Sequence, residues 1–441
     1  MASTETHRAI EAVWRAESAK VIAHVARIVR DVGLAEELAQ DALLAALEHW
    51  GDGVLPDNPA AWLMTTAKHR ALDRLRQDAL HARKHEELGH ELDAMQAHVV
   101  PDFVDGLDAA REDDIGDDLL RLIFTACHPV LSTDARVALT LRLLGGLTTD
   151  EIARAFLVPE PTIAQRIVRA KRTLAEARVP FEVPRADALP ARLAAVLGVI
   201  YLIYNEGYAA TAGAEWMRPA LCDDALRLGR ILAALMPEDA EVHGLVGLME
   251  IQSSRTGARR GPDGEPVLLL EQNRTRWDRL LIARGLAALQ RAEALAQAHG
   301  AALGPYALQA AIAACHARAA TAEATDWPRI AALYDALAQT APSPVVELNR
   351  AVAVAMAYGP EQGLAIADAL LREPALRQYH LLPSVRADLL ARLGRHALAQ
   401  VEFERAASMT RNARERTLLL ERARRSAAAG SAAGNSGSSD N

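Results

Sequence analysis

The sequence predicts an all-α protein: two small helical domains, the second a helix-turn-helix, followed by an α-solenoid of packed helix pairs. Three observations lead to this. Alanine and leucine dominate the 441 residues and aromatic residues make up only 4%, so runs of the β-branched and aromatic residues that favour strands are nearly absent. Residues 147–174 have the pattern of two short helices around a tight turn. From about residue 306 onward, similar residues recur at a fixed spacing.

The helix-turn-helix is predicted from local signals in residues 147–174 (LTTDEIARAFLVPEPTIAQRIVRAKRTL). Thr148 and Glu151 have the spacing of a capping box, in which each side chain accepts a hydrogen bond from the other residue's backbone N–H. Pro159 ends the first helix, because an interior proline removes a backbone hydrogen bond. Pro161 suits the first turn of the next helix, where its missing N–H has no consequence. A short helix and a longer, basic helix are therefore expected.

The basic helix is the predicted reader of DNA. Its apolar residues repeat with helical spacing and should be buried: Ile163, Ile167, Ala170 and Leu174. Its other side carries Thr162, Gln165, Arg166, Arg169 and Arg172, which are side chains that suit base edges and phosphates. A merely solvated helix face is the alternative interpretation. However, this local excess of positive charge occurs in a chain of net charge −8, so any nucleic-acid contact must be local.

Composition limits the class of protein further. The three cysteines, Cys127, Cys222 and Cys315, are far apart in the chain, as expected for free thiols in a reducing cytoplasm. No run approaches the roughly 18 apolar residues of a membrane span. We therefore expect a soluble, cytoplasmic protein with no membrane partner.

The first 80 residues predict three helices. Two lie within residues 8–50 and are expected to separate at Gly33, the second running from Leu34 to Trp50 with an acidic outer side. The third is opened by Asn58 and Pro59. We expect Trp62 of this helix to lie in the core. The opposite side of the helix carries positive charge, which makes it a second candidate surface for phosphate contact: Lys68, Arg70, Arg74 and Arg76.

An acidic linker is predicted next, because residues 102–118 contain eight acidic residues and only one basic residue. A helical pattern returns over residues 118–144. Cys127 and His128 are adjacent in this stretch, without a second pair at zinc-ligand spacing. We interpret them as core or turn residues and not as a metal site.

Three segments in this order resemble the two-domain bacterial extracytoplasmic-function (ECF) sigma factors of RNA polymerase. Residues 35–50 (AEELAQDALLAALEHW) are similar to the segment that binds the largest polymerase subunit. Residues 58–76 (NPAAWLMTTAKHRALDRLR) are similar to the segment that melts and reads the minus-10 promoter element. Residues 141–174 are similar to the domain that reads the minus-35 element. The resemblance covers about the first 180 residues.

The resemblance implies that the partners are promoter DNA and core RNA polymerase, through its beta-prime and beta subunits. Nucleotidyl transfer belongs to the polymerase, so no catalytic residue and no cofactor is expected. The polymerase-binding residues would be Glu37, Gln40, Asp41 and Leu44. The minus-10 contacts would come from Lys68, Arg70, Arg74 and Arg76, and the minus-35 contacts from Thr162, Gln165, Arg166, Arg169 and Arg172.

The chain continues for about 260 residues beyond the two sigma-like domains. Ile330, Leu364 and Leu398 are spaced by 34 residues, which is the tetratricopeptide period of one helix pair. Such pairs stack into a solenoid. Tyr201, Tyr204 and Tyr208 share one helical face and are expected to be buried aromatics with satisfied hydroxyls; a ligand patch or a docking patch for the sigma domains is the alternative.

The whole chain is therefore similar to ECF sigma factors with a C-terminal tetratricopeptide-like extension, which implies regulation in cis through an unidentified protein or ligand. The expected organisation is sigma region 2 at 8–80, an acidic linker at 81–118, sigma region 4 at 119–179, a second linker at 180–190, the helical repeat domain at 191–425 and a disordered tail at 426–441.

Two other classes of function were weighed. A stand-alone helix-turn-helix regulator, acting without polymerase, is the alternative that the sequence leaves open. An enzyme is disfavoured, because no nucleophile elbow, phosphate-binding loop or paired metal motif occurs.

Overall fold

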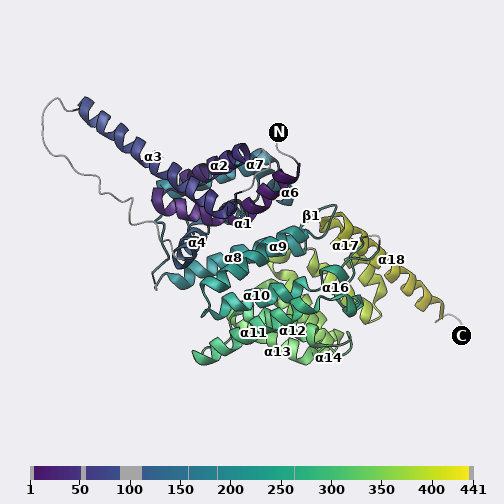
Figure 1. Cartoon of the computed structure of the whole chain (residues 1–441). Coiled ribbons are helices and arrows are strands. Elements are labelled where there is room, and N and C mark those ends of the chain that lie inside the picture. The colour runs from purple at the N-terminus through teal and green to yellow at the C-terminus, as the bar shows by residue number, and fades with distance from the viewer. Residues whose placement is uncertain are drawn as a thin grey trace. The chain divides into compact units, whose positions relative to one another are not determined.

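The structure, a computed structural model, describes residues 4–50, 56–89, 112–156, 158–185, 187–262 and 264–436. It is almost entirely helical, which confirms the predicted all-α class. The chain divides into two compact units, Met1–Ile200 and Tyr201–Asn441 (Figure 1). The boundary falls inside helix α8 (Leu189–Tyr208), about ten residues after the predicted start of the repeat domain at 191.

The first unit contains the predicted sigma-like domains. Helix α1 packs on α2, α3 and α4, whereas α5, α6 and α7 pack on one another, and α2 also contacts α7. The helices are α1 (Thr4–Val29), α2 (Val32–His49), α3 (Pro59–Gly89), α4 (Glu112–Ala126), α5 (Thr133–Leu143), α6 (Thr149–Phe156) and α7 (Glu160–Glu176).

The corner between α1 and α2 lies earlier than predicted. Arg30 takes a left-handed conformation, with φ 55°. The side chain of Asp31 then caps α2 by accepting a hydrogen bond from the backbone N–H of Leu34, at 2.8 Å. Aspartate is a strong N-cap residue, so the helix begins there. Gly33 lies inside α2, and the prediction that it ends the first helix was wrong.

The helix-turn-helix is confirmed in detail. Thr148 Oγ1 accepts a hydrogen bond from the Glu151 N–H at 3.1 Å, and Glu151 Oε2 accepts one from the Thr148 N–H at 2.7 Å. Pro159 is the N-cap residue of α7, and Pro161 lies in its first turn. The predicted apolar stripe of α7 is buried: Ile163, Ile167, Ala170 and Leu174.

The second unit is a series of helices in which each packs on the next, from α9 to α10 and then from α10 through α18. Figure 1 shows these helices lying side by side. They are α9 (Pro219–Leu235), α10 (Ala240–Ser253), α11 (Arg279–Ala298), α12 (Pro305–Arg318), α13 (Trp327–Thr340), α14 (Pro344–Tyr358), α15 (Pro360–Ala369), α16 (Leu381–Arg392), α17 (His396–Met409) and α18 (Ala413–Ser436).

The 34-residue spacing corresponds to helix pairs. Ile330, Leu364 and Leu398 lie in α13, α15 and α17, each the first helix of a pair. Ile330 and Leu364 are buried, whereas Leu398 is exposed. Small residues allow the close crossings: a Cβ on Gly363 would lie 2.4 Å from the Cβ of Ala355, so α14 and α15 approach too closely there for any side chain.

A feature that the sequence did not predict joins the two ends of this unit. Strand β1 (Ala212–Gly213) pairs in parallel with β2 (Arg411–Asn412). The buried Asn412 side chain donates hydrogen bonds to the carbonyls of Ala210 and Glu215, at 3.2 and 2.9 Å. We call this arrangement the clasp. It attaches the start of α18 to the segment that follows α8.

Helix α8 is the single helix, within the described ranges, that is long and apolar enough to cross a membrane by length and composition alone. Several of its apolar side chains are buried in the protein, among them Leu193, Val196 and Ile203.

Two predicted irregular segments are partly helical. The acidic linker, expected at 81–118, overlaps the end of α3 at Gly89 and the start of α4 at Glu112, and its residues 90–111 lie outside the described ranges. The predicted disorder from residue 426 was wrong as far as Ser436, where α18 ends. The physical reason is the alanine content, since alanine has the highest helix propensity. Residues 437–441 lie outside the described part.

Candidate nucleic-acid interface

The predicted reader residues of α7 gather at one hollow of the first unit. Thr162, Gln165, Arg166 and Arg169 line a cavity of about 390 Å³, together with the segment from Val130 to Ala135. Arg166 also makes an ion pair with Asp134, at 3.1 Å. Thr162, Gln165 and Arg169 are exposed. The arrangement presents hydroxyl, amide and guanidinium groups together, which are the groups that hydrogen-bond to base edges and phosphates.

Arg172 is not part of this hollow. Its Nε donates to Glu176 Oε1 at 2.6 Å, one turn further along α7, and the side chain is largely exposed. Seven residues after Gln165, it points in nearly the same direction around the helix axis but lies about 10 Å further along it. The structure therefore brings four of the five predicted residues together and places Arg172 at the edge of the set.

The predicted polymerase-binding residues share one face of α2. Their spacing places all four within about 100° of the helix circumference: Glu37, Gln40, Asp41 and Leu44. The side chain of Leu44 is 57% exposed. A large apolar side chain this exposed, among polar neighbours, is the usual anchor of a protein–protein contact.

The basic residues of α3 form two sets. Arg70 and Arg74 lie on one side of the helix and Lys68 and Arg76 on another, because 100° separates successive residues. Three of these arginines form ion pairs. Arg70 lies 3.6 Å from Asp41 on α2. Within α3, Arg74 pairs with Asp78 and Arg76 pairs with Asp73, both at 3.2 Å. The net positive charge of this surface is therefore smaller than the residue list predicts.

Trp62 packs at the start of α3. Its ring meets that of Trp50 edge-on at 5.2 Å, and it lies 6.0 Å from the ring of His49. Trp62 is only half-buried, whereas Trp50 is 2% exposed. Its packing role is confirmed, and part of the side chain remains accessible to solvent.

Sequence reasoning missed a buried carboxylate between the two sigma-like domains. Glu36 on α2 is 3% exposed. Its Oε1 accepts a hydrogen bond from Arg142 of α5 at 2.6 Å, and its Oε2 pairs with Lys171 of α7. Gln40 donates to the same carboxylate at 2.7 Å. The only signal in the sequence was an acidic residue on the apolar side of α2. We call Glu36, Arg142 and Lys171 the Glu36 triad.

A second buried carboxylate supports α4. Asp118 is fully buried and lies 2.8 Å from Arg27 on α1 and 2.6 Å from Arg121 on α4. His24 is 3.7 Å away. At the other end of the unit Arg15 on α1 pairs with Glu151 of α6 at 2.9 Å. Charged contacts thus link α1 and α2 to α4, α5, α6 and α7.

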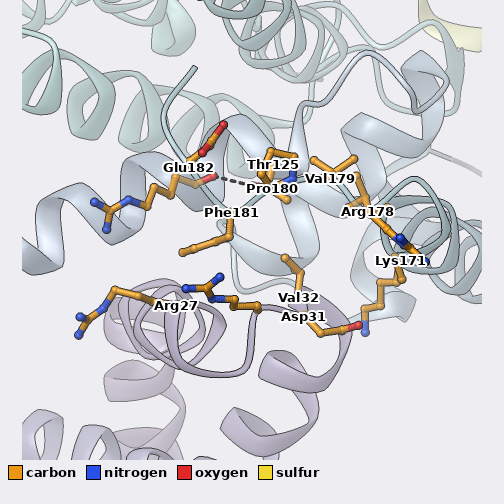
Figure 2. Close-up of a pocket in the computed structure, with 14 residues that line it drawn as sticks. Arg27, Asp31, Val32, Thr125, Lys171, Arg178, Val179, Pro180, Phe181 and Glu182 are labelled. Atoms are coloured by element: carbon orange, nitrogen blue, oxygen red, sulfur yellow. Dashed lines mark hydrogen bonds between the residues drawn. The ribbon is translucent and has the colours of Figure 1, made fainter. Parts of the chain in front are cut away.

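The junction between these helices is hollow. Figure 2 shows a cavity of about 660 Å³ with the α1–α2 corner on one side and the end of α7 on the other. Arg27, Asp31 and Lys171 line it, and Phe181 and Glu182 from the segment after α7 complete it. A polar junction with an open cavity costs less to separate than a packed apolar core, because little apolar area is lost from burial.

Cys127 is a core residue, as predicted. It is 1% exposed, its Sγ lies 3.4 Å from Thr140 Oγ1, and burial raises the pKa of its thiol to about 11. Tyr201 and Tyr204 also have satisfied hydroxyls: they donate to Gln309 Oε1 and to the carbonyl of Met249, both at 3.0 Å. The buried-aromatic interpretation is confirmed for Tyr204, whereas Tyr201 is only partly buried.

Comparison with known proteins identifies both domains of the first unit. Residues 13–80 match the family model "Sigma-70 region 2", and residues 121–174 match "Sigma-70, region 4". Residues 192–293 match a family of unknown function, DUF6596. No solved structure matches the chain.

Three relatives illustrate the similarity. An uncharacterised protein, R00370, from Rhizobium meliloti is 42% identical over 390 residues, which is 88% of this chain and 89% of the relative. The ECF RNA polymerase sigma factor SigK of Mycobacterium bovis is 31% identical over 159 residues, 35% of this chain and 78% of SigK. The probable ECF sigma factor SigI of Mycobacterium tuberculosis is 26% identical over 183 residues, 41% of this chain and 59% of SigI.

A region 2 helical bundle followed by a region 4 helix-turn-helix defines a DNA-binding sigma factor of the sigma-70 type. The chain belongs to the ECF RNA polymerase sigma factors, and it carries a helical C-terminal extension. Its function is in transcription initiation.

Proposed function

We propose that this sigma factor binds core RNA polymerase through the outer face of α2 and reads the two promoter elements with α3 and α7. The observation that carries the proposal is the hollow on α7, which gathers Thr162, Gln165, Arg166 and Arg169. An inserted helix with arginine and glutamine suffices to read duplex DNA in the major groove. We assign the minus-35 element to this surface.

The α2 face is assigned to the polymerase. Leu44 would enter an apolar site on the enzyme, and Glu37 and Asp41 would meet basic groups around it. Asp41 lies near Arg70 of α3, at 3.6 Å. The polymerase-binding face and the minus-10 face are thus adjacent, which suits a factor that presents single-stranded promoter DNA to the enzyme. Arg70 and Arg74 would hold the backbone of that strand.

The first unit must open for both elements to be read at once. As their names state, the two elements are centred about 25 base pairs apart, which is about 85 Å of B-DNA. In the structure Lys171 of α7 contacts Glu36 of α2, and Arg70 of α3 contacts Asp41 of the same helix. The two DNA-binding helices are therefore separated by on the order of 30 Å at most. We infer that the compact unit is a closed form and that the Glu36 triad holds it closed.

The C-terminal unit is assigned a regulatory role in cis. It is part of the same chain, and stacked helix pairs form extended binding surfaces in other proteins. Its input, a protein or a small ligand, would change the balance between the closed and open forms.

The test is a pull-down with purified bacterial core RNA polymerase followed by in vitro transcription, using the full chain. We expect the wild-type protein to be retained by the polymerase and to direct initiation from a subset of promoters. The Leu44→Arg variant should be folded but not retained. A folded wild-type protein that fails to bind polymerase and binds duplex DNA alone would overturn the proposal in favour of a stand-alone regulator.

A further inference from the structure

Three arginines lie in the interior of the second unit, within the turn after α10 and the segment that leads to α11. Arg255, Arg259 and Arg274 are 7%, 6% and 8% exposed. The short 3₁₀ turn η1 (Thr256–Ala258) places Arg255 and Arg259 on the same side, and Arg274 opens the 3₁₀ turn η3 (Arg274–Arg276). Arginine is rarely buried to this extent unless it is paired.

The three guanidinium groups alternate with aromatic rings. Arg259 Cζ lies 3.5 Å from the ring centre of Tyr208 and 4.4 Å from that of Trp216. Arg255 Cζ lies 5.9 Å from both Tyr208 and Trp277. Arg274 Cζ lies 4.9 Å from Trp277. We call this set the arginine–aromatic cluster. Cation–π contacts of this kind lower the cost of burial, but they do not neutralise the charges. Glu323 acts electrostatically on Arg274, whereas Arg255 and Arg259 have no carboxylate in an ion pair within the described residues.

Two of the arginines have fixed hydrogen-bond acceptors. Arg274 donates to the carbonyls of His316 and Ala319, at 2.6 and 2.7 Å, and Arg259 donates to the carbonyl of Tyr208 at 2.5 Å. These acceptors are neutral. In the part of the chain that the structure describes, no ion pair with a carboxylate includes Arg255, Arg259 or Arg274.

Three buried N–H groups at or beside the Trp277 ring lack a hydrogen-bond acceptor in the described part of the chain. The buried Arg255 Nε, Arg274 Nε and Trp277 Nε1 have no hydrogen-bond acceptor within the described residues. A buried donor without an acceptor costs about 1–3 kcal/mol, and more when it is charged. Unpartnered donors beside a buried positive charge suit an anion with several lone pairs.

The cluster lies close to the surface. Gly257, between Arg255 and Arg259, is exposed, and a Cβ built on it would meet only the carbonyl oxygen of Arg276, at 3.9 Å. Arg260 and Arg276, which flank the cluster in the chain, add further positive charge, whereas His316 does not. Burial, together with the fields of Arg255 and Arg274, lowers the pKa of His316 to about 4, so this imidazole is neutral at pH 7.

We propose that the arginine–aromatic cluster binds a small oxyanion, a phosphate or a carboxylate, with Arg255 as its principal ligand. A guanidinium group binds such groups through two parallel hydrogen bonds. Arg274 and Trp277 would supply further N–H donors. This inference goes beyond the proposed function, because it concerns a ligand of the C-terminal unit and does not depend on polymerase or DNA.

The first experiment measures binding to the purified full-length protein. Inorganic phosphate and citrate are titrated separately by calorimetry, and the melting temperature is measured in each anion and in sodium chloride of equal ionic strength. We expect one of the two anions to bind and to raise the melting temperature above that in chloride. A response to phosphate alone identifies a phosphate-type ligand, and a response to citrate alone a carboxylate. No binding of either anion overturns the proposal.

Variants separate a ligand site from a structural arginine. Arg255→Met removes the charge and should abolish binding, while its melting temperature in chloride should equal or exceed that of the wild type, because an uncompensated buried charge is gone. Arg255→Lys keeps the charge but loses the planar guanidinium group that donates two parallel hydrogen bonds. It should weaken anion binding about tenfold or more. Arg284→Met, at an exposed arginine of α11, is the matched control and should bind as the wild type does. Unchanged binding in Arg255→Met, or a lower melting temperature of that variant in chloride, would overturn the assignment.

Discussion

Glu36 and Arg142 are separated by 106 residues in the chain, yet Arg142 Nε lies 2.6 Å from Glu36 Oε1. Lys171 completes the Glu36 triad from α7. Removing one partner from a buried ion pair leaves the other charge uncompensated, which costs about 3–5 kcal/mol. The Glu36 triad is therefore one of the charged contacts between the region 2 and region 4 domains, beside those of Asp118 with Arg27 and of Arg15 with Glu151.

Glu36→Gln should loosen this contact. The amide keeps the shape of the side chain but removes the charge that Arg142 and Lys171 share, so the closed form should lose about 3 kcal/mol. Hydrogen–deuterium exchange of the free protein should rise in α2, α5 and α7. Glu37→Gln, one residue along on the exposed face, is the matched control. Unchanged exchange in all three helices would show that the triad does not hold the unit closed.

Arg169→Ala should change promoter preference. If Arg169 contacts a base from the α7 hollow, the affinity of the assembled polymerase should fall by about 1–3 kcal/mol on promoters that carry the preferred base and little on others. The measurement is promoter binding with a series of minus-35 sequences. Arg172→Ala should have a smaller effect that is the same on all sequences, because Arg172 lies beside the hollow and pairs with Glu176. Equal loss for both variants would contradict the assigned geometry.

Leu44→Arg should abolish polymerase binding and leave the fold intact. The side chain is 57% exposed, so a charged replacement costs little in the free protein, whereas it would bury a charge at an apolar interface. Binding to core polymerase is measured by pull-down, with far-UV circular dichroism as the check on folding. Leu398→Arg, at a similarly exposed leucine of α17, should bind normally. Retention of the Leu44→Arg variant would exclude this face of α2.

Acid should destabilise the second unit through His316. Its pKa falls from 6.5 to about 4 in the folded protein, because burial and the nearby Arg255 and Arg274 disfavour the charged form. Between these two values the unfolded chain binds a proton that the folded chain does not, so stability is lost as pH falls from about 6.5 to about 4. At pH 5 the loss is about 2 kcal/mol relative to pH 7.

Hydrogen exchange of α12 at pH 7 and pH 5, corrected for intrinsic rates, measures this change. In His316→Gln the difference between the two pH values should be smaller by about 2 kcal/mol. His299→Gln, at an exposed position, is the matched control. An identical pH dependence in His316→Gln and the wild type would show that this imidazole is not the group responsible.

Local signals predicted the helix-turn-helix well. The capping box of Thr148 and Glu151, the prolines and the apolar stripe of α7 act within a few residues of each other, so the sequence determines them directly. Four reader residues also gather at one hollow because helical spacing already places them together. Helical spacing and side-chain chemistry predicted that they read DNA, and the family resemblance supplied the assignment to the minus-35 element.

Long-range contacts could not be predicted. The position of Glu36 on the apolar side of α2 was the only local sign that it differs from the exposed Glu37 beside it. Its pairing with two helices distant in the chain had no local sign. The same holds for Arg255, whose aromatic neighbours Tyr208 and Trp277 are distant in the chain. The pairing of Arg74 with Asp78, in contrast, is local and follows from their i, i+4 spacing.

The clasp changes how the second unit should respond to stress. An open solenoid unravels from its ends, since each repeat contacts only its neighbours. Here β2 pairs with β1, and Asn412 bonds the carbonyl of Ala210, 202 residues earlier in the chain. The start of α18 is thus tied to the beginning of the unit. Detaching it requires the loss of contacts there, so the array between the two strands should melt as one cooperative block.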